Sequence, residues 1–323
     1  MPHVAAFVVA GLALAGGAWI VSFSTEQVGQ RFGPAITGLM QSTLGNLPEF
    51  FVVIFALQAG QKIVAETAIL GSILVNALLV LGLVLIVGSR REPDRIMRFS
   101  ARLPNDTATL LLIASFIIVL VGLADSSNDH ASHHIKTISI LSAVAILAVY
   151  GFWVRQYLTT DQASDAPREK ARLSTASSLV LLVLSGLAAA FVSDWFVHAL
   201  EPTIKSTGIS KPFAGLVIVA IAGNAVEHAV GVVLAHKGQP ELAISVVKNS
   251  VAQVAAFLYP LLVLVSLLTA TTLTFALPPV YTGALLGTAI IIWQITGDGE
   301  ATPFEGAALV AAFVILATVA AFE

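Results

Sequence analysis

The sequence predicts an all-α, polytopic membrane protein of about ten transmembrane helices, arranged as two inverted five-helix repeats. The first observation is composition: 57% of the 323 residues are hydrophobic and 11% are charged. Soluble domains are about half apolar and about a quarter charged. The second is a series of ten long apolar segments, and the third is a polar motif that occurs once in each half of the chain.

The apolar segments match the thickness of a bilayer, because a hydrocarbon core of about 30 Å needs about 20 apolar residues per helix. The first segment lacks the basic flank of a secretory signal, so we expect it to stay in the membrane as a helix. The ten expected helices cover residues 4–23, 34–59, 64–88, 105–124, 136–158, 174–198, 212–236, 241–267, 278–297 and 303–322.

A polar, charged segment at residues 159–173 is the expected linker between a first repeat, 1–158, and a second, 174–323. Loops rich in Lys and Arg usually stay cytoplasmic. The loops after even-numbered helices hold only four basic residues: Lys62, Lys136, Lys205 and Lys211. The loops after odd-numbered helices, which include the linker, hold more, so we expect them to be cytoplasmic and both termini to be outside. Those loops hold eleven basic residues: Arg31, Arg90, Arg91, Arg95, Arg98, Arg102, Arg155, Arg168, Lys170, Arg172 and Lys237.

The repeated motif is Gly-Asn-Leu-Pro-Glu at 45–49 and Gly-Asn-Ala-Val-Glu-His at 223–228. Five crossings separate the two copies, so they run in opposite directions through the membrane. Secondary transporters often bind their substrates where such inverted repeats meet. In each copy Asn and Glu are three residues apart, which would place both side chains on one helical face.

Glu49 and Glu227 are the main candidates for a functional site, because intramembrane carboxylates usually mark ion or proton pathways. The alternative is a pair of neutral acids that join two helices. Pro48 has no amide hydrogen, so the carbonyl of Leu44 loses its helical hydrogen bond. Either a bound cation satisfies this carbonyl, or the proline only makes a kink that helps the helices pack. Val226 replaces the proline in the second copy, so this feature is not expected to be symmetric.

The helix after each motif carries further polar residues within apolar sequence. Carboxylate, amide and hydroxyl oxygens, in a chain without cysteine, suit a hard cation such as calcium. Polar contacts between helices are the alternative. We take the two glutamates as the metal ligands, and a histidine next to one of them suits proton traffic. The candidate ion- and proton-binding residues are Glu49, Glu227, Asn46, Asn224, Ser72, Ser250, Gln253, Asn76 and His228.

These motifs resemble the calcium/cation exchangers, specifically their proton-coupled (CAX-like) antiporter branch. The family pattern is Gly-Asn-x-x-Glu followed by Gly-Ser-x-x-x-Asn, then Gly-Asn-Ala-x-Glu-His followed by Gly-Ser-Ser-x-Gln. The first repeat matches in full, with Gly71 opening its second helix motif. The second departs from the pattern at Asn249 and Val251, where the family has Gly and Ser.

The resemblance implies exchange of calcium, or a similar divalent cation, for protons, with Glu49 and Glu227 accepting either one. Two nearby carboxylates repel one another, which favours neutralisation by protons or by a cation and couples their titrations. We therefore expect competition between calcium and protons during alternating access. A sodium-coupled cation exchanger or a sodium/proton antiporter is the alternative.

Other classes have less support. We expect no enzyme activity, because the sequence lacks His-Glu-x-x-His and the Gly-x-Gly-Asp of intramembrane aspartyl proteases, and we expect no cofactor. Scattered basic residues and a net charge of −3 do not favour nucleic-acid binding. A cation channel would be distinguished by currents above carrier turnover. The partners are the bilayer, inorganic cations and protons, and we expect the cell (plasma) membrane as the location.

Three polar features have simpler explanations than transport. Lys248 should face away from Ser250 and form an ion pair or extend to the membrane surface. Asp194 and His198 should form a local hydrogen bond rather than feed protons to the site. The loop 125–134, rich in His and Asp, matches no ordered metal motif and is expected to be solvated; a weak cation-collecting mouth is the alternative.

Overall fold

The computed structural model describes residues 2–29, 40, 43–100, 102–127, 130–161 and 172–323. The expected linker at 159–173 and the positions of Arg31, Arg168 and Lys170 therefore lie largely or wholly outside the described residues. The described part of the first half contains α1 (Pro2–Gly29), α3 (Leu47–Gln58), α4 (Lys62–Leu74), the π-helical segment η1 (Val75–Val80), α5 (Leu81–Ser89), β1 (Met97–Arg98), α6 (Arg102–Ser127), the 3-10 turn η2 (His130–His134) and α7 (Ile135–Asp161).

The second half follows the same order of long and broken helices. It contains α8 (Thr175–Thr207), α9 (Lys211–Phe213), the π-helical segment η3 (Ala214–Val219), α10 (Ala220–Gly223), α11 (Ala225–His236), α12 (Pro240–Gln253), the π-helical segment η4 (Val254–Leu258), α13 (Tyr259–Val265), the 3-10 turn η5 (Ser266–Leu268), α14 (Pro279–Thr296), β2 (Glu300–Ala301) and α15 (Pro303–Phe322).

The expected membrane segments are found as helices. Eight described helices are long and apolar enough to cross a bilayer, and a ninth span is bent by 64° between residues 223 and 225. The remaining segment, 34–59, is described from residue 43 onwards and contains α3, which is short and apolar. The all-α, polytopic fold predicted from the sequence is confirmed.

Sequence signals fix several helix ends. Ser174 caps α8 by accepting a hydrogen bond from the Ser177 amide, and Gly208 ends that helix at φ 74°, a left-handed conformation that glycine adopts without strain. Thr302 and Glu305 form a reciprocal capping box at the start of α15. Local chemistry therefore sets where these spans begin and end.

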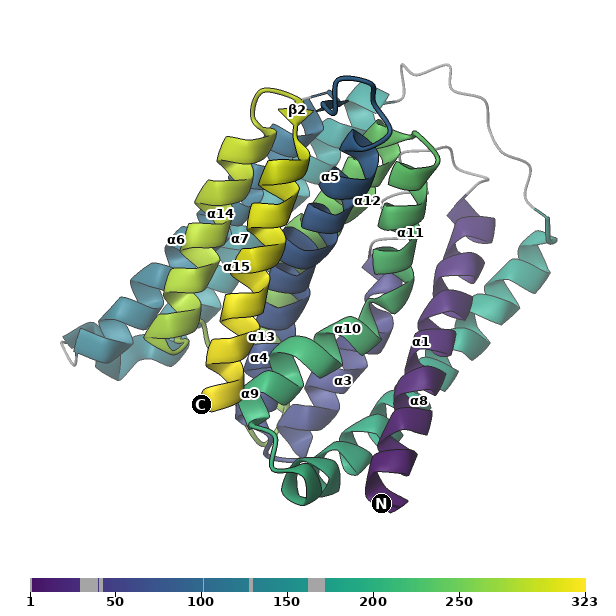
Figure 1. The fold of residues 1–323 in the computed structure, drawn as a ribbon. Helices are drawn as coiled ribbons and strands as arrows, with labels where there is room; N and C mark the ends of the chain where they lie inside the picture. Colours follow the sequence, from purple (N-terminus) through teal and green to yellow (C-terminus); the bar gives the residue numbers. More distant parts are fainter. Residues whose placement is uncertain (1, 30–39, 41–42, 101, 128–129, 162–171) are drawn as a thin grey trace.

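The two halves run in opposite directions through the bundle (Figure 1). The short connections at 58–62, 207–211 and 268–279 lie at the end that also holds both chain ends, which we call the termini end. The loops at 90–100 and 297–302 lie at the opposite end, which we call the arginine end. From its first residue α3 runs toward the termini end, whereas α11 runs toward the arginine end, as the odd number of crossings predicts.

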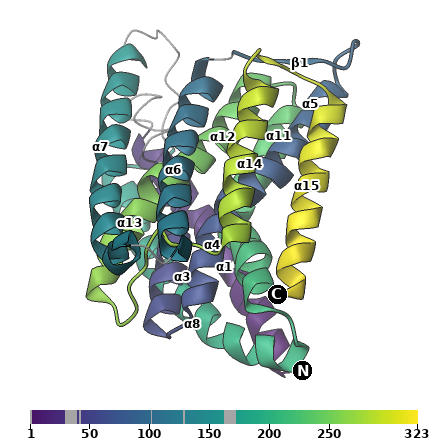
Figure 2. The same ribbon diagram turned by 90° about the vertical axis from the view of Figure 1, so that its left-hand side faces the viewer.

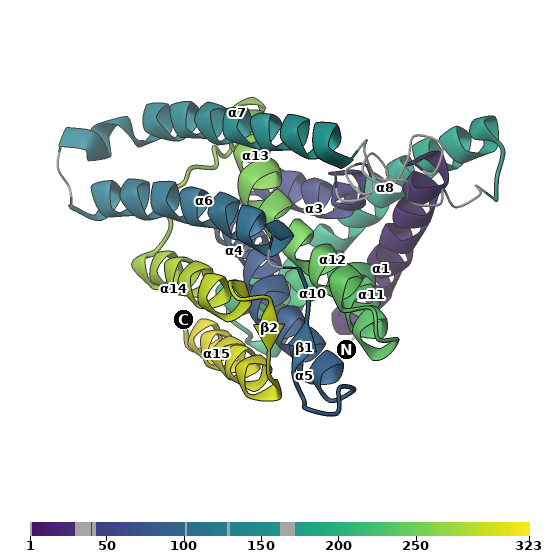
Figure 3. The same cartoon turned by 90° about the horizontal axis from the view of Figure 1, so that it is seen from above.

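Equivalent helices of the two halves make equivalent contacts. The first and sixth spans, α1 and α8, pack against each other at one side of the bundle (Figures 1 and 3). The third span contacts the tenth through α5 and α15, and the eighth contacts the fifth through α13 and α7, as Figure 2 shows from another side. Large apolar side chains on the outer helices are exposed, including Leu12 at 70% and Phe191 at 74%, as lipid-facing positions require.

A short antiparallel ribbon at the arginine end joins the loop after α5 to the loop after α14. Met97 pairs with Ala301 and Arg98 with Glu300. The Arg98 guanidinium also lies 2.6 Å from Asp94 and 3.2 Å from the Glu300 carboxylate. Hydrogen bonding from Arg98 lowers the pKa of Asp94, so this pairing is complete at neutral pH and is lost only in acid. The ribbon thus links the two repeats.

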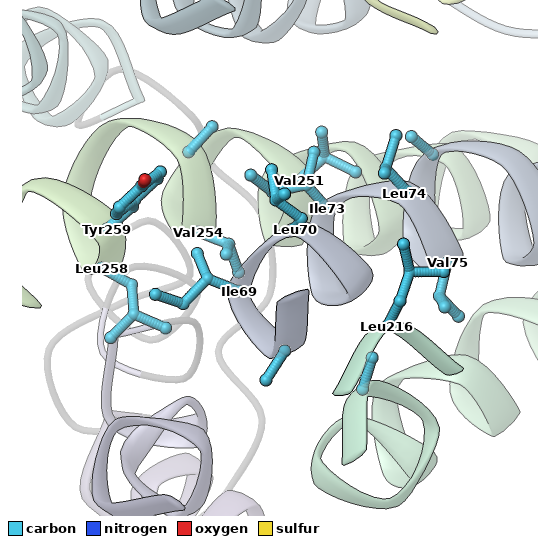
Figure 4. Close-up of a cluster of buried hydrophobic side chains, with 14 of the residues drawn as sticks. Ile69, Leu70, Ile73, Leu74, Val75, Leu216, Val251, Val254, Leu258 and Tyr259 are labelled. Atoms are coloured by element: carbon cyan, nitrogen blue, oxygen red, sulfur yellow. The ribbon is translucent and has the colours of Figure 1, made fainter. Parts of the chain in front are cut away.

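The core is centred on the third, seventh and eighth spans. Figure 4 shows apolar side chains of α4, η3 and the α12–η4 region gathered into one cluster. A side chain at Gly71 in α4 would overlap the backbone of Leu216 in η3, so only glycine permits this close approach. The polar residues of α4 and α12 are therefore held by tight helix packing.

Candidate functional site

Both repeated motifs lie at helix breaks half-way along the bundle. Asn46 precedes α3 at φ −81° and ψ 5°, and Asn224 separates α10 from α11 at φ −113° and ψ 16°. Glu49 and Glu227 occupy the first turns of α3 and α11. The partial positive charge of a helix N-terminus favours a carboxylate there.

One expectation needs correction at this point. Asn and Glu do not share a face of one continuous helix, because each asparagine lies outside the helix that carries its glutamate. The helix break is present in both repeats, although only the first has a proline. At Asn224 the chain departs from helical geometry without one, so a proline is not required for the break in the second repeat.

Hydrogen bonds join the polar residues of the two repeats directly. The Asn224 side-chain amide donates to the Ser72 hydroxyl at 2.8 Å and to the carbonyl of Ala220 at 3.1 Å. Asn76 donates to the carbonyl of Ser72 at 3.0 Å and to the Ser250 hydroxyl at 3.4 Å. Residues that are far apart in the sequence thus form one connected polar cluster.

The two glutamates have different partners. Ser250 donates its hydroxyl to the Glu227 carboxylate at 2.5 Å. Glu49 is 3% exposed, and neither of its carboxylate oxygens has a hydrogen-bond partner among the described residues. Ser72 and Asn224 lie beside Glu49; the Ser72 hydroxyl accepts from Asn224 and keeps its own proton available to a neighbouring carboxylate. An ionised carboxylate in such a place is costly unless a cation or a proton neutralises it.

The glycine of each motif lies against the glutamate of the other motif. A Cβ atom at Gly45 would lie 3.4 Å from the Oε1 atom of Glu227, and one at Gly223 would lie 3.9 Å from the Cβ atom of Glu49. Each repeat therefore presents a bare backbone to the glutamate of the other repeat. The two carboxylates project from opposed half-helices into one shared region.

The remaining predicted residues take less uniform positions. Asn46 is buried at its helix break, and Gln253 is buried one turn beyond Ser250. The Oδ1 atom of Asn76 is buried without a hydrogen-bond partner within the described part of the chain. His228 follows Glu227 on α11, and in the described residues its Nε2 atom has no hydrogen-bond partner. It is adjacent to the polar cluster rather than bonded into it.

Two residues near the site had no signal in the sequence patterns. Ser193 of α8 donates its hydroxyl to the carbonyl of Pro48 at 3.1 Å, next to the first helix break. Tyr150 of α7 places its buried hydroxyl beside Thr43 and Gln253. A single serine or tyrosine within a long apolar segment does not stand out, and only the packing of helices identifies these two.

The three other polar features are also located. Of the two explanations predicted for Lys248, an ion pair or extension to the membrane surface, its 2% exposure contradicts the second; its ammonium group donates to the Thr296 hydroxyl at 2.6 Å. His198 contacts the Asp194 carboxylate at 3.3 Å, which confirms the local pairing. Residues 128 and 129 of the histidine-rich loop lie outside the described residues, and among the described ones no three or more His, Cys, Asp or Glu side chains gather into a metal-binding group.

The family model for the sodium/calcium exchanger protein matches residues 2–156 and 177–322, nearly the whole chain. The chain belongs to this family. It is a membrane transporter and not an enzyme. The resemblance found in the sequence motifs is therefore confirmed, and the family match covers both repeats.

Individual relatives point to the same group of proteins. A vacuolar calcium ion transporter of Schizosaccharomyces pombe is 31% identical over 96% of this chain and 77% of its own length. The Ca(2+)/H(+) antiporter ChaA of Bacillus subtilis is 32% identical over 91% of this chain and 85% of its own. These names agree with the proton-coupled branch predicted from the motifs.

Solved structures share the fold. Native YfkE superposes with a TM-score of 0.82 at 26% identity, covering 98% of this chain and 92% of its own. The H+/Ca2+ exchanger CAX superposes with a TM-score of 0.73 at 18% identity, covering 100% of this chain and 86% of its own. The broken helices and the inverted repeats therefore belong to an established exchanger fold.

Proposed function

We propose that this protein is a secondary active antiporter that exchanges calcium, or a similar divalent cation, for protons by alternating access. The observation that carries the proposal is the pair Glu49 and Glu227, held by opposed half-helices at one polar cluster inside the bundle. The relatives named as calcium transporters and Ca(2+)/H(+) antiporters support this choice of substrates.

The proposed ion site combines the two carboxylates with neutral oxygen atoms. Hard divalent cations prefer carboxylate, carbonyl, amide and hydroxyl oxygens. Asn76 has a buried side-chain oxygen with no hydrogen-bond partner in the described structure, and the hydroxyl groups of Ser72 and Ser250 retain lone pairs. The other proposed members are Asn46, Asn224, Gln253 and His228.

Charge balance gives the exchange mechanism. A divalent cation neutralises both carboxylates, and so do two protons. An unloaded dianion would be costly within the membrane. Calcium and protons therefore compete for the pair, and only the neutralised states change access from one side to the other.

The protein is an integral, multi-pass membrane protein. We propose the cell (plasma) membrane as its location, and the basic loops support a cytoplasmic arginine end. Some relatives are vacuolar exchangers, so localisation of a tagged protein is the direct measurement. The same proposal divides the chain into repeats 1–158 and 174–323 with a linker at 159–173.

The decisive experiment reconstitutes the purified protein in proteoliposomes. An inside-acid pH gradient is imposed without sodium, and calcium uptake is followed. We expect uptake that stops when the pH gradient is dissipated. Uptake that requires a sodium gradient instead would assign the protein to sodium-coupled exchange and overturn the proton coupling.

A further inference from the structure

A cavity of about 360 Å³ lies at the termini end of the bundle, away from the glutamate pair. Its walls come from α4, from the start of α9, from the start of α14 and from the last residue of the chain. The polar residues that line it are Glu66, Thr67, Ser210, Lys211, Tyr281 and Glu323.

Glu66 is the residue that gives this cavity a chemical preference. It is 8% exposed, and within the described part of the chain its Oε1 atom has no hydrogen bond, only an ion pair with Lys62. The nearest cation is the ammonium group of Lys62, at 3.4 Å, on a side chain that is 45% exposed. A loose pair with a half-exposed lysine leaves the buried carboxylate open to a stronger cation.

Further oxygen atoms surround the same space. Tyr281 donates its hydroxyl to the Glu323 carboxylate at 2.5 Å, which fixes a second acidic group at the cavity wall. Thr67 and Ser210 add hydroxyl oxygens. Six water molecules at about 30 Å³ each occupy about 180 Å³, so a hydrated divalent cation fits the volume.

The cavity is separate from the transport site but adjoins the helices that build it. Glu66 precedes Ser72 by six residues on α4, about 9 Å along the helix axis. The facing wall, at Ser210 and Lys211, continues through η3 and α10 to Asn224. We propose that the cavity is an accessory site for a hydrated divalent cation, centred on Glu66. Cation binding in this cavity does not depend on the proposed function, whereas its effect on the kinetics of calcium transport rests on that function.

Binding is tested with terbium(III), a luminescent probe of calcium sites, in the purified double variant Glu49→Gln/Glu227→Gln, which lacks the carboxylates of the transport site. Tyr281 lies in the cavity wall and can sensitise emission from a bound ion. We expect saturable emission that calcium displaces. Adding Glu66→Gln should abolish it, whereas adding Asp125→Asn, which removes an exposed carboxylate outside the cavity, should not.

Glu66→Asp keeps the charge and should retain weaker binding, so it separates loss of the ligand from loss of the fold. Terbium emission that is unchanged by Glu66→Gln, or absent from the double variant, would overturn the proposal whatever the protein transports. In proteoliposomes, Glu66→Gln alone should raise the apparent KM for calcium at the termini end about tenfold, as expected for one lost charged ligand, and leave the maximal rate unchanged.

Discussion

Neutralising Glu49 should stabilise the calcium-free protein, and should do so more than neutralising Glu227. An ionised acid at the centre of a bilayer costs about 2.5 to 3.5 kcal/mol. Glu49 accepts no hydrogen bond in the described structure, so Glu49→Gln should recover most of that cost, about 2 to 3 kcal/mol at alkaline pH. Glu227 accepts a hydrogen bond from Ser250, which already offsets about 1.5 to 3 kcal/mol. Glu227→Gln should therefore gain about 1 kcal/mol or less.

The assay is unfolding of the purified variants in detergent, with and without calcium. Wild-type protein at a calcium concentration 100 times its Kd should gain about 2.7 kcal/mol from binding, and both variants should lose that gain. The reasoning fails if Glu49→Gln is less stable than wild type without calcium, or if Glu227→Gln gains as much as Glu49→Gln. Both variants should also lose calcium exchange, and full transport by either would remove the proposed site.

Three further outcomes follow from contacts described above. Gly71→Ala should destabilise the protein by about 1 to 3 kcal/mol, because its Cβ would overlap the Leu216 backbone. Gly16→Ala, in the interior of α1, meets no atom within 4 Å and should be neutral or stabilising by up to about 1 kcal/mol in the same unfolding assay. Ser250→Ala should raise the apparent KM for calcium in proteoliposomes by about 10- to 100-fold, since it removes a hydrogen bond to a carboxylate; an unchanged KM would contradict this role. Arg98→Ala should lower the melting temperature in low salt but not in molar salt, because its ion pairs are half-exposed.

The fold was predictable because each span leaves a strong local signal. Segment length, the basic loops and the odd number of crossings between the motifs required only the chain itself. The helix break at Asn224 was not predictable in the same way, since the apolar run 212–236 continues through it without a proline. At this break the Asn224 side chain donates to Ser72 of the other repeat, a contact that the sequence alone does not show.

The site was predictable in its residue types and not in its connections. Motif spacing identified Glu49 and Glu227. The difference in their hydrogen bonding depends on how the helices pack, because packing decides which of the two carboxylates Ser250 contacts. Lys248 shows the same limit: helical phase correctly turned it away from Ser250, whereas its burial against Thr296 depends on a helix 48 positions away in the sequence. Helical phase gives a direction, and only the packing of the spans gives the partner.

The contact of each motif's glycine with the other motif's glutamate bears on how two repeats can share one site. Neither half has a complete site, because each contributes one glutamate, and Gly45 lies against Glu227 as Gly223 lies against Glu49. Two copies of a single five-helix unit, inserted in opposite orientations, would form the same pairing as a homodimer. Joining them in one polypeptide fixes the antiparallel pair and allows each copy its own sequence, as at Pro48 and Val226.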